Sequence, residues 1–131
     1  MADAIDSNVL VYAVAGIGPK RARARAVLAE GGTVSAQALN ETAHELRRKA
    51  GLSLAEVRDA LATVRALVRV VPLTETVHDR ALHLAEATGY SVWDASILAA
   101  ALEAGCSRLR SEDMQHGRRI EGLAIENPFL S

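Results

Sequence analysis

The sequence is poor in aromatic residues and cysteine, and each shortage excludes a class of structure. Aromatic residues make up only 3% of the 131 residues, so a core must be built from Ala, Val, Leu and Ile, as in compact α/β and helical domains. The single cysteine, Cys106, excludes an intrachain disulfide and is typical of a reducing cytoplasm. The sequence shows neither a basic leader nor an apolar run long enough to cross a bilayer, so we expect a cytoplasmic protein without a membrane segment.

The sequence also lacks an excess of basic residues. The formal net charge is −1 and the pI is about 6.4, which removes any argument from bulk basicity to nucleic-acid binding. Any contact with RNA or DNA must therefore be local. A chain of this length is large enough to bury a conventional core, and we expect one domain over residues 1–131.

Short apolar segments alternate with helical patterns along the whole chain. This alternation predicts a three-layer α/β/α fold with a central, mainly parallel sheet of four to five short strands, flanked by helices. The segment from position 95 to 102 is apolar on nearly every side, so its helix should be buried in the middle of the fold. Strands are predicted at the start of the chain and near 33–35, 70–73, 108–110 and 123–125, and helices near 20–29, 36–50, 54–68, 76–89 and 92–102.

Four acidic residues follow predicted strands or begin predicted helices: Asp6, Glu41, Asp94 and Asp113. In a parallel sheet the loops after the strands open on one edge, so carboxylates that follow separate strands meet there. Carboxylates about 5 Å apart repel each other by a few kcal/mol, so such a cluster needs cations or partial protonation. Oxygen ligands without His or Cys select Mg²⁺ or Mn²⁺ over Zn²⁺. These four residues are therefore a candidate metal site, with Mg²⁺ as the expected cofactor and Mn²⁺ as an alternative.

Each acid also has a simpler interpretation. Asp94 lies three residues after Ser91, where an acid helps to cap a helix. Glu41 lies away from the apolar side of its helix and is compatible with a solvated surface position, and Asp113 is compatible with an ordinary turn. Asp6 is the hardest to explain without a function, because it interrupts a buried strand.

Four blocks of the sequence, in this order, resemble the PIN-domain ribonuclease family, and especially its VapC-type toxins from prokaryotic toxin–antitoxin pairs. The blocks are residues 5–12, 35–41, 92–101 and 111–117, the last followed by Asn127-Pro128-Phe129. Any single block is a weak signal, whereas four in the right order with the right gaps are a strong one.

The resemblance implies a divalent-metal-dependent endoribonuclease that acts on RNA, forms a homodimer and is restrained by a dedicated antitoxin. It also implies metal-binding and catalytic roles for the four acids and supporting roles for two polar residues, Asn8 and Ser111. The alternative within the same family is a catalytically silent PIN-like domain that binds a protein or RNA without cutting it.

Basic residues are the candidates for holding RNA on a net-negative protein. The densest group is Lys20, Arg21, Arg23 and Arg25, which is compatible with RNA binding and with an ordinary solvated helix face.

Arg110 stands in the strand before the last block, where relatives usually carry an apolar residue, and Arg108, two positions earlier, points to the same side of the strand. They indicate either a solvated edge strand, which we favour, or a phosphate contact beside the metals, in which Arg110 would bind RNA.

Two other enzyme classes place acids at strand ends but fit less well. A haloacid-dehalogenase-type phosphatase needs a second Asp two residues after the first, where this chain has Asn8. A response-regulator receiver needs an acidic pair near the first strand and a Lys after a late one, and neither is present. The four His residues are not spaced for a zinc site.

Overall fold

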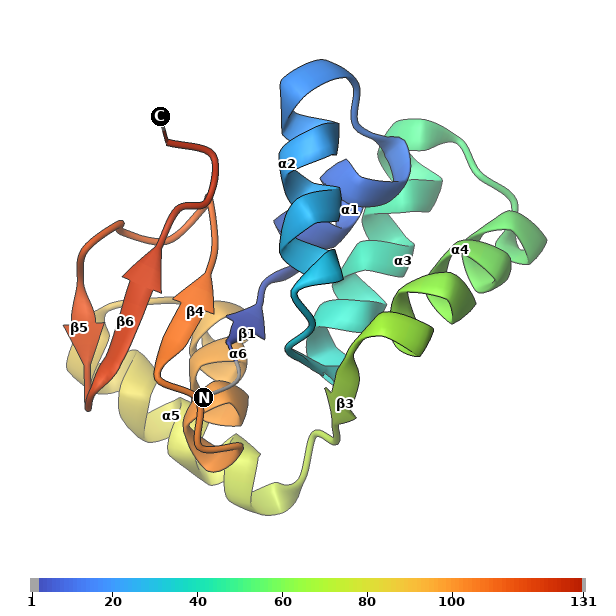
Figure 1. Cartoon of the computed structure of the whole chain (residues 1–131). Coiled ribbons are helices and arrows are strands. Elements are labelled where there is room, and N and C mark those ends of the chain that lie inside the picture. Colours follow the sequence, from blue (N-terminus) through green and yellow to red (C-terminus); the bar gives the residue numbers. More distant parts are fainter. Residues whose placement is uncertain (1–2, 131) are drawn as a thin grey trace.

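The computed structural model describes residues 3–130, in which short strands alternate with longer helices (Figure 1). The strands are β1 (Ala4–Ile5), β2 (Thr33–Ser35), β3 (Arg69–Val71), β4 (Arg108–Arg110), β5 (Arg119–Ile120) and β6 (Leu123–Glu126). The helices are α1 (Ser7–Ala15), α2 (Gly18–Ala29), α3 (Ala36–Ala50), α4 (Leu54–Leu67), α5 (Glu75–Thr88) and α6 (Val92–Glu103). Among the predicted segments, 33–35 and 36–50 match the observed elements residue for residue.

The strands form one six-stranded sheet in the order β3-β2-β1-β4-β6-β5, parallel except for the pairing of β5 with β6. This arrangement confirms the predicted α/β/α fold with a mainly parallel sheet, although the strand count is six rather than four to five. The unpredicted strand is β5, which joins β6 through Glu121 and Gly122. Both turn residues have positive φ, at 50° and 89°, as a tight two-residue hairpin turn requires.

Helices flank the sheet on both sides. In Figure 1, α5 and α6 lie behind the strands, whereas α1 to α4 gather at the other side of the molecule. Residues 95–101 of α6 are all buried, which confirms the prediction of a central helix, and α6 contacts β2, β4 and β6. Within the part of the chain that the structure describes, no helix is both long and apolar enough to span a membrane.

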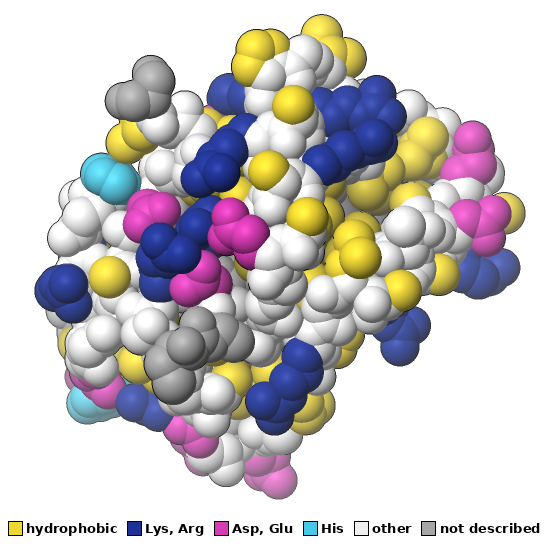
Figure 2. All heavy atoms as spheres, viewed as in Figure 1, with side chains coloured by type: hydrophobic (Ala, Val, Ile, Leu, Met, Phe, Trp, Pro, Cys, Tyr) yellow, Lys and Arg dark blue, Asp and Glu magenta, His cyan; other side chains and the backbone are white. Residues whose placement is uncertain are grey.

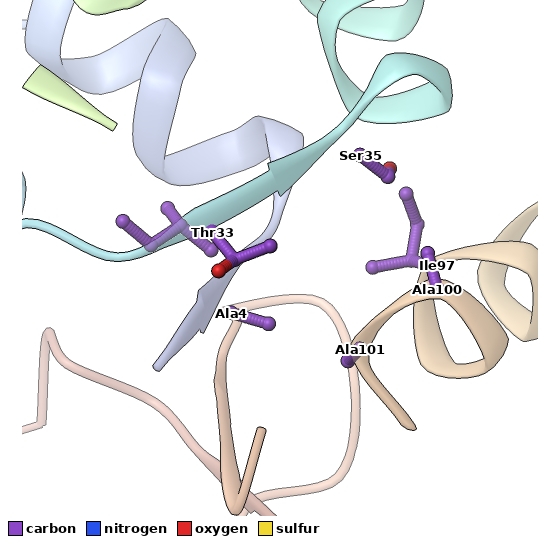
Figure 3. Close-up of a pocket in the computed structure, with 7 residues that line it drawn as sticks. Ala4, Thr33, Ser35, Ile97, Ala100 and Ala101 are labelled. Carbon is purple, nitrogen blue, oxygen red and sulfur yellow. The ribbon is translucent and has the colours of Figure 1, made fainter. Parts of the chain in front are cut away.

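Small side chains let α6 approach the sheet closely. Figure 3 shows Ala100 and Ala101 of α6 facing Ala4 and Thr33 on the strands, around a cavity of about 10 Å³. A space of this size holds at most one water molecule. Little empty space is therefore left between α6 and strands β1 and β2, and the contact of α6 with β2 helps to fix the helix that carries Asp94.

The edge-strand prediction for β4 is wrong, because β4 lies in the interior of the sheet between β1 and β6. Arg110 is only 3% exposed, and its guanidinium lies 3.4–3.6 Å from carboxylate oxygens of Asp3, Glu30 and Glu126. Arg108 pairs with two of the same acids, Asp3 at 2.6 Å and Glu126 at 2.9 Å. Figure 2 shows acidic and basic side chains gathered together over this part of the sheet.

Candidate metal centre

The ends of the parallel strands open into a cleft of about 980 Å³. Strands β1, β2 and β4 end at neighbouring positions, so the segments that follow them surround one space, as in other parallel sheets. Three of the four predicted acids line the cleft, namely Glu41, Asp94 and Asp113. Two further acids, Glu45 and Glu112, line it as well.

Asp6 is buried at the base of this region, with 3% of its surface exposed. It is the N-cap of α1, and its Oδ1 accepts a 2.7 Å hydrogen bond from the backbone N–H of Ser7. Its Oδ2 accepts hydrogen bonds from the Ser111 hydroxyl at 2.7 Å and from the Asn8 amide at 3.3 Å. Burial raises the pKa of Asp6 to about 6, and the nearby charges of Glu41 and Asp94 add to this rise although the hydrogen bonds oppose it.

Glu41 reaches the same site from the second turn of α3. Its Oε1 accepts a 3.2 Å hydrogen bond from the hydroxyl of Ser7, the residue next to Asp6, and its Oε2 accepts a 2.8 Å bond from Gln37. The interpretation of Glu41 as an ordinary solvated residue is therefore wrong, because its carboxylate lines the cleft and is held from two sides.

Asp94 serves both as a helix-cap residue and as a cleft residue. Its backbone N–H donates a 3.1 Å hydrogen bond to the hydroxyl of Ser91, the N-cap of α6, while its side chain lines the cleft. Partial burial raises the pKa of Asp94, and repulsion by Glu41 and Asp113 raises it further. The two interpretations of Asp94 are thus compatible, since they use different groups of one residue.

Asn8 connects the two sides of the site. Its amide nitrogen lies 3.3 Å from Asp6 Oδ2, 3.3 Å from Asp113 Oδ2 and 3.4 Å from the Ser111 hydroxyl. Its carbonyl oxygen accepts a 3.0 Å hydrogen bond from the backbone N–H of Glu112. Asn8 and Ser111 therefore hold Asp6 and the loop that carries Asp113 in a fixed relation, as the supporting role predicted for them requires.

The four predicted acids carry charge that the protein itself does not neutralise. Across residues 3–130, none of the four forms an ion pair with Lys or Arg. No three His, Cys, Asp or Glu side chains in the same range are arranged to hold a metal ion as they stand. The all-oxygen donor set and the uncompensated charge suit a hard divalent cation, and the donors fit by type rather than as a preformed shell.

Sequence reasoning did not single out Glu112, a further acid of the cleft. Glu112 is neutralised, unlike the four predicted acids, by Lys20 at 2.5 Å and by a 2.6 Å hydrogen bond from the Tyr12 hydroxyl. Although burial opposes the effect, these two bonds lower the pKa of Glu112. Its position beside Asp113 was the available signal, but a residue next to a motif acid is usually an ordinary surface residue.

The structure separates the candidate RNA-binding residues. Lys20 lies beside Glu112 at the cleft, whereas Arg25 donates to the backbone of Ala13 and Arg23 to the backbone of Pro128. Arg21 is exposed on α2. Arg110 is buried among acids, which contradicts the hypothesis that it contacts RNA.

Solved structures with the same fold include a toxin and a toxin–antitoxin complex. One is the sarcin-ricin loop cleaving toxin VapC20 of Mycobacterium tuberculosis, with a TM-score of 0.72, 19% identity, and coverage of 86% of this chain and 90% of that chain. Another is a toxin–antitoxin complex from Klebsiella pneumoniae, with a TM-score of 0.75, 15% identity and 98% coverage of both chains. A third is VapBC2 of Rickettsia felis, bound to a promoter DNA fragment, with a TM-score of 0.72, 17% identity, and coverage of 97% of this chain and 98% of that chain.

At 15–19% identity these structural similarities show a shared fold only, and the family is shown by the match of the sequence to a family model. No curated protein matches the sequence significantly. The family model of the PIN domain matches residues 4–120, which include the four acids and both polar supports. The chain belongs to the PIN domain family.

Proposed function

We propose that this protein is a divalent-metal-dependent endoribonuclease and the toxin component of a toxin–antitoxin pair. The observation that carries the proposal is the convergence of four carboxylates without basic partners around one cleft of a PIN domain. Buried or crowded carboxylates that lack a cation in the protein are relieved either by partial protonation or by a cation from solution, and the latter is the role we propose for a divalent metal. A PIN-like module that only binds a partner has no need for this uncompensated charge.

The metal would be held by carboxylate oxygens of Asp6, Glu41, Asp94 and Asp113. A bound Mg²⁺ or Mn²⁺ supplies a water of lowered pKa as the nucleophile and stabilises the charge that develops on the phosphate oxygens. Asp6 acts as a ligand in its ionised form, and because its pKa is raised to about 6, metal binding competes with protonation below about this pH. The hydrogen bonds from Ser111 and Ser7 keep its two oxygens in place for this role.

The remaining cleft residues orient the acids and receive the substrate. Gln37 holds Glu41 from one side at 2.8 Å, and Ser7 holds it from the other at 3.2 Å. The cleft extends along α3, where His44 and Lys49 line it, so an RNA backbone bound along this helix would reach the carboxylates.

Structures with the same fold also support a proposal about the binding partners of this protein. The structure from Klebsiella pneumoniae is a toxin–antitoxin complex, which supports a cognate antitoxin for this chain. Such an antitoxin would lay a helix over the apolar surface of α3 and α4 and present a basic side chain to the acids. We propose in addition that the protein is a homodimer, as the family resemblance implies.

RNA cleavage by the purified protein tests the enzymatic proposal. We expect cleavage with Mg²⁺ or Mn²⁺, none with a chelator, and a loss of at least about 100-fold for Asp6→Asn and for Asp94→Asn, in the range by which catalytic groups of this kind contribute. Asp79→Asn is the matched control, because Asp79 is exposed on α5 outside the cleft.

Two outcomes of this experiment distinguish cleavage at these carboxylates from cleavage by a contaminating nuclease. Activity that disappears only in the two cleft variants supports the carboxylate centre. Activity that survives both substitutions, or falls equally in Asp79→Asn, shows that these acids do not carry the reaction.

A further inference from the structure

Trp93 is the aromatic residue that the fold leaves without a partner within residues 3–130. The ring of Tyr12 packs edge-on against Phe129 at 5.0 Å, and Tyr90 lies under the guanidinium of Arg118 at 4.9 Å. Trp93 is instead 66% exposed. A tryptophan ring offers the largest apolar surface of any side chain, so an exposed one at a cleft is available for contact with a ligand.

The position of Trp93 relates it to the metal centre. It lies in the first turn of α6, directly before Asp94, and lines the same cleft as Glu41 and Asp113. A ligand that extends through the cleft from the carboxylates can therefore reach the indole ring.

The charge of the cleft restricts what can bind there. Five acids line it, and only two basic or titratable cationic side chains, His44 and Lys49, are among its lining residues within the described part of the chain. Lys49 is already paired with Glu45 at 3.0 Å. Electrostatic attraction from the protein is thus weak near the acids, and a neutral contact is needed to hold a nucleic acid in place. Base stacking on an aromatic ring is such a contact, and it works for every base.

We propose that Trp93 is a stacking platform for an unpaired RNA base next to the scissile phosphate, an inference that rests on the proposed nuclease function. A base within a duplex is covered on both faces by its neighbours and cannot stack on a side chain. The Trp93 contact therefore requires an unpaired base beside the scissile phosphate and disfavours continuous duplex at that position.

Kinetics with modified substrates test this contact. Truncation of Trp93 to Ala is expected to raise KM for a short single-stranded RNA by about 5- to 150-fold, the range found for lost base stacking, with a smaller effect on kcat. Trp93→Phe should retain most of the affinity. Leu82→Ala, which removes an exposed apolar side chain of α5 outside the cleft, is the matched control.

An abasic site on either side of the scissile phosphate identifies the stacked base. The wild type should lose affinity for one of the two abasic RNAs, and Trp93→Ala should not distinguish that RNA from the intact one. Equal KM values for wild type and Trp93→Ala, or equal losses on the abasic RNA in both, would overturn the proposal.

Fluorescence separates this contact from the activity. Trp93 is the only tryptophan of the chain, so its emission reports on its own surroundings. In the Asp6→Asn variant with chelator present, single-stranded RNA should quench the emission saturably and duplex RNA should not. If the wild type cuts no RNA, the nuclease proposal fails, but this quenching would still support the Trp93 contact. An emission that shifts with protein concentration and does not respond to RNA would show that a second copy covers the ring, and would overturn the proposal.

Discussion

The hydroxyl of Ser111 donates a 2.7 Å hydrogen bond to Oδ2 of Asp6, across 105 residues of sequence. The two residues follow β4 and β1, which are parallel neighbours in the sheet, with Arg110 in register with Ile5. The bond therefore depends on the register of the sheet, and in turn it fixes one oxygen of the buried acid.

Ser111→Ala is expected to reduce both stability and metal affinity. It leaves an oxygen of a buried carboxylate without its shortest side-chain hydrogen bond, which costs about 1–3 kcal/mol of unfolding free energy. Loss of an outer-sphere partner of this kind also weakens metal binding by about 10- to 100-fold. Chemical denaturation and Mn²⁺ titration measure the two effects, with the exposed Ser107→Ala as control. Unchanged Mn²⁺ affinity would show that Ser111 does not position Asp6.

The order of strands and helices could be predicted from local patterns in the sequence. That order implies a parallel sheet, and the parallel sheet in turn predicts that the acids lie around one edge. Helix α3 could be bounded in advance because Ser35 caps its start and Gly51 adopts the left-handed conformation at its end, with φ of 67°. Asp6 stood out because a charge inside a buried strand requires a reason. The side chain is buried and its pKa is raised, but Asp6 does not interrupt a strand, because β1 ends at Ile5 and Asp6 is the N-cap of α1.

The errors concern contacts that no local pattern encodes. Arg110 was interpreted as a residue of a solvated edge strand because a charged residue in a strand usually faces water. In the fold, acids from three separate segments surround it and make burial possible: Asp3, Glu30 and Glu126. Strand β5 was missed because two residues are too few to show alternation. Trp93 was missed as a cleft residue because its exposure becomes visible only in three dimensions.

Asp6→Asn is expected to stabilise the metal-free protein at neutral pH. The pKa of Asp6 is raised from 3.8 to about 6 on folding, so the unfolded chain loses this proton first and stability falls as the pH rises from about 4 to 6. A shift of this size corresponds to about 3 kcal/mol at pH 7. Thermal unfolding with chelator should show the Asp6→Asn variant to be more stable than the wild type at pH 7, with the difference fading below about pH 4.

The same experiment would also be informative if the Asp6→Asn substitution lowered the stability instead of raising it. A metal-free Asp6→Asn variant that is less stable than the wild type at pH 7 would show that the hydrogen bonds from Ser7 and Ser111 outweigh the cost of burying the charge. Asp79→Asn, on the exposed side of α5, should be unchanged at every pH.

Glu126→Gln is expected to destabilise the protein by about 1–3 kcal/mol. It removes a negative charge that pairs with Arg108 at 2.9 Å and lies 3.6 Å from the buried Arg110, two of whose nitrogens lack a hydrogen-bond partner within residues 3–130. Urea denaturation measures the change. Glu45→Gln removes the acid of the exposed ion pairs with Arg48 and Lys49 within α3, and it should lower the unfolding free energy by less than about 1 kcal/mol. Equal effects of the two substitutions would contradict a special role of the buried guanidinium.

Ala101→Leu is expected to destabilise the packing of α6 on the sheet by about 1–3 kcal/mol. The cavity of about 10 Å³ beside Ala101 cannot accept the larger side chain, so α6 or β1 must move. The same substitution at Ala26, which is exposed on α2, should leave the unfolding free energy nearly unchanged. If Ala101→Leu is tolerated without loss, the interface is looser than its small side chains indicate.

The most direct test of the metal centre is a calorimetric Mn²⁺ titration, near neutral pH, of the wild type and of the single variants Asp6→Asn, Glu41→Gln, Asp94→Asn and Asp113→Asn. We expect the wild type to bind Mn²⁺ and each variant to bind at least about tenfold more weakly, because each has lost a charged ligand. The Asp79→Asn control should bind like the wild type. Equal Mn²⁺ affinity in all the variants would contradict the claim that these four carboxylates form one metal site.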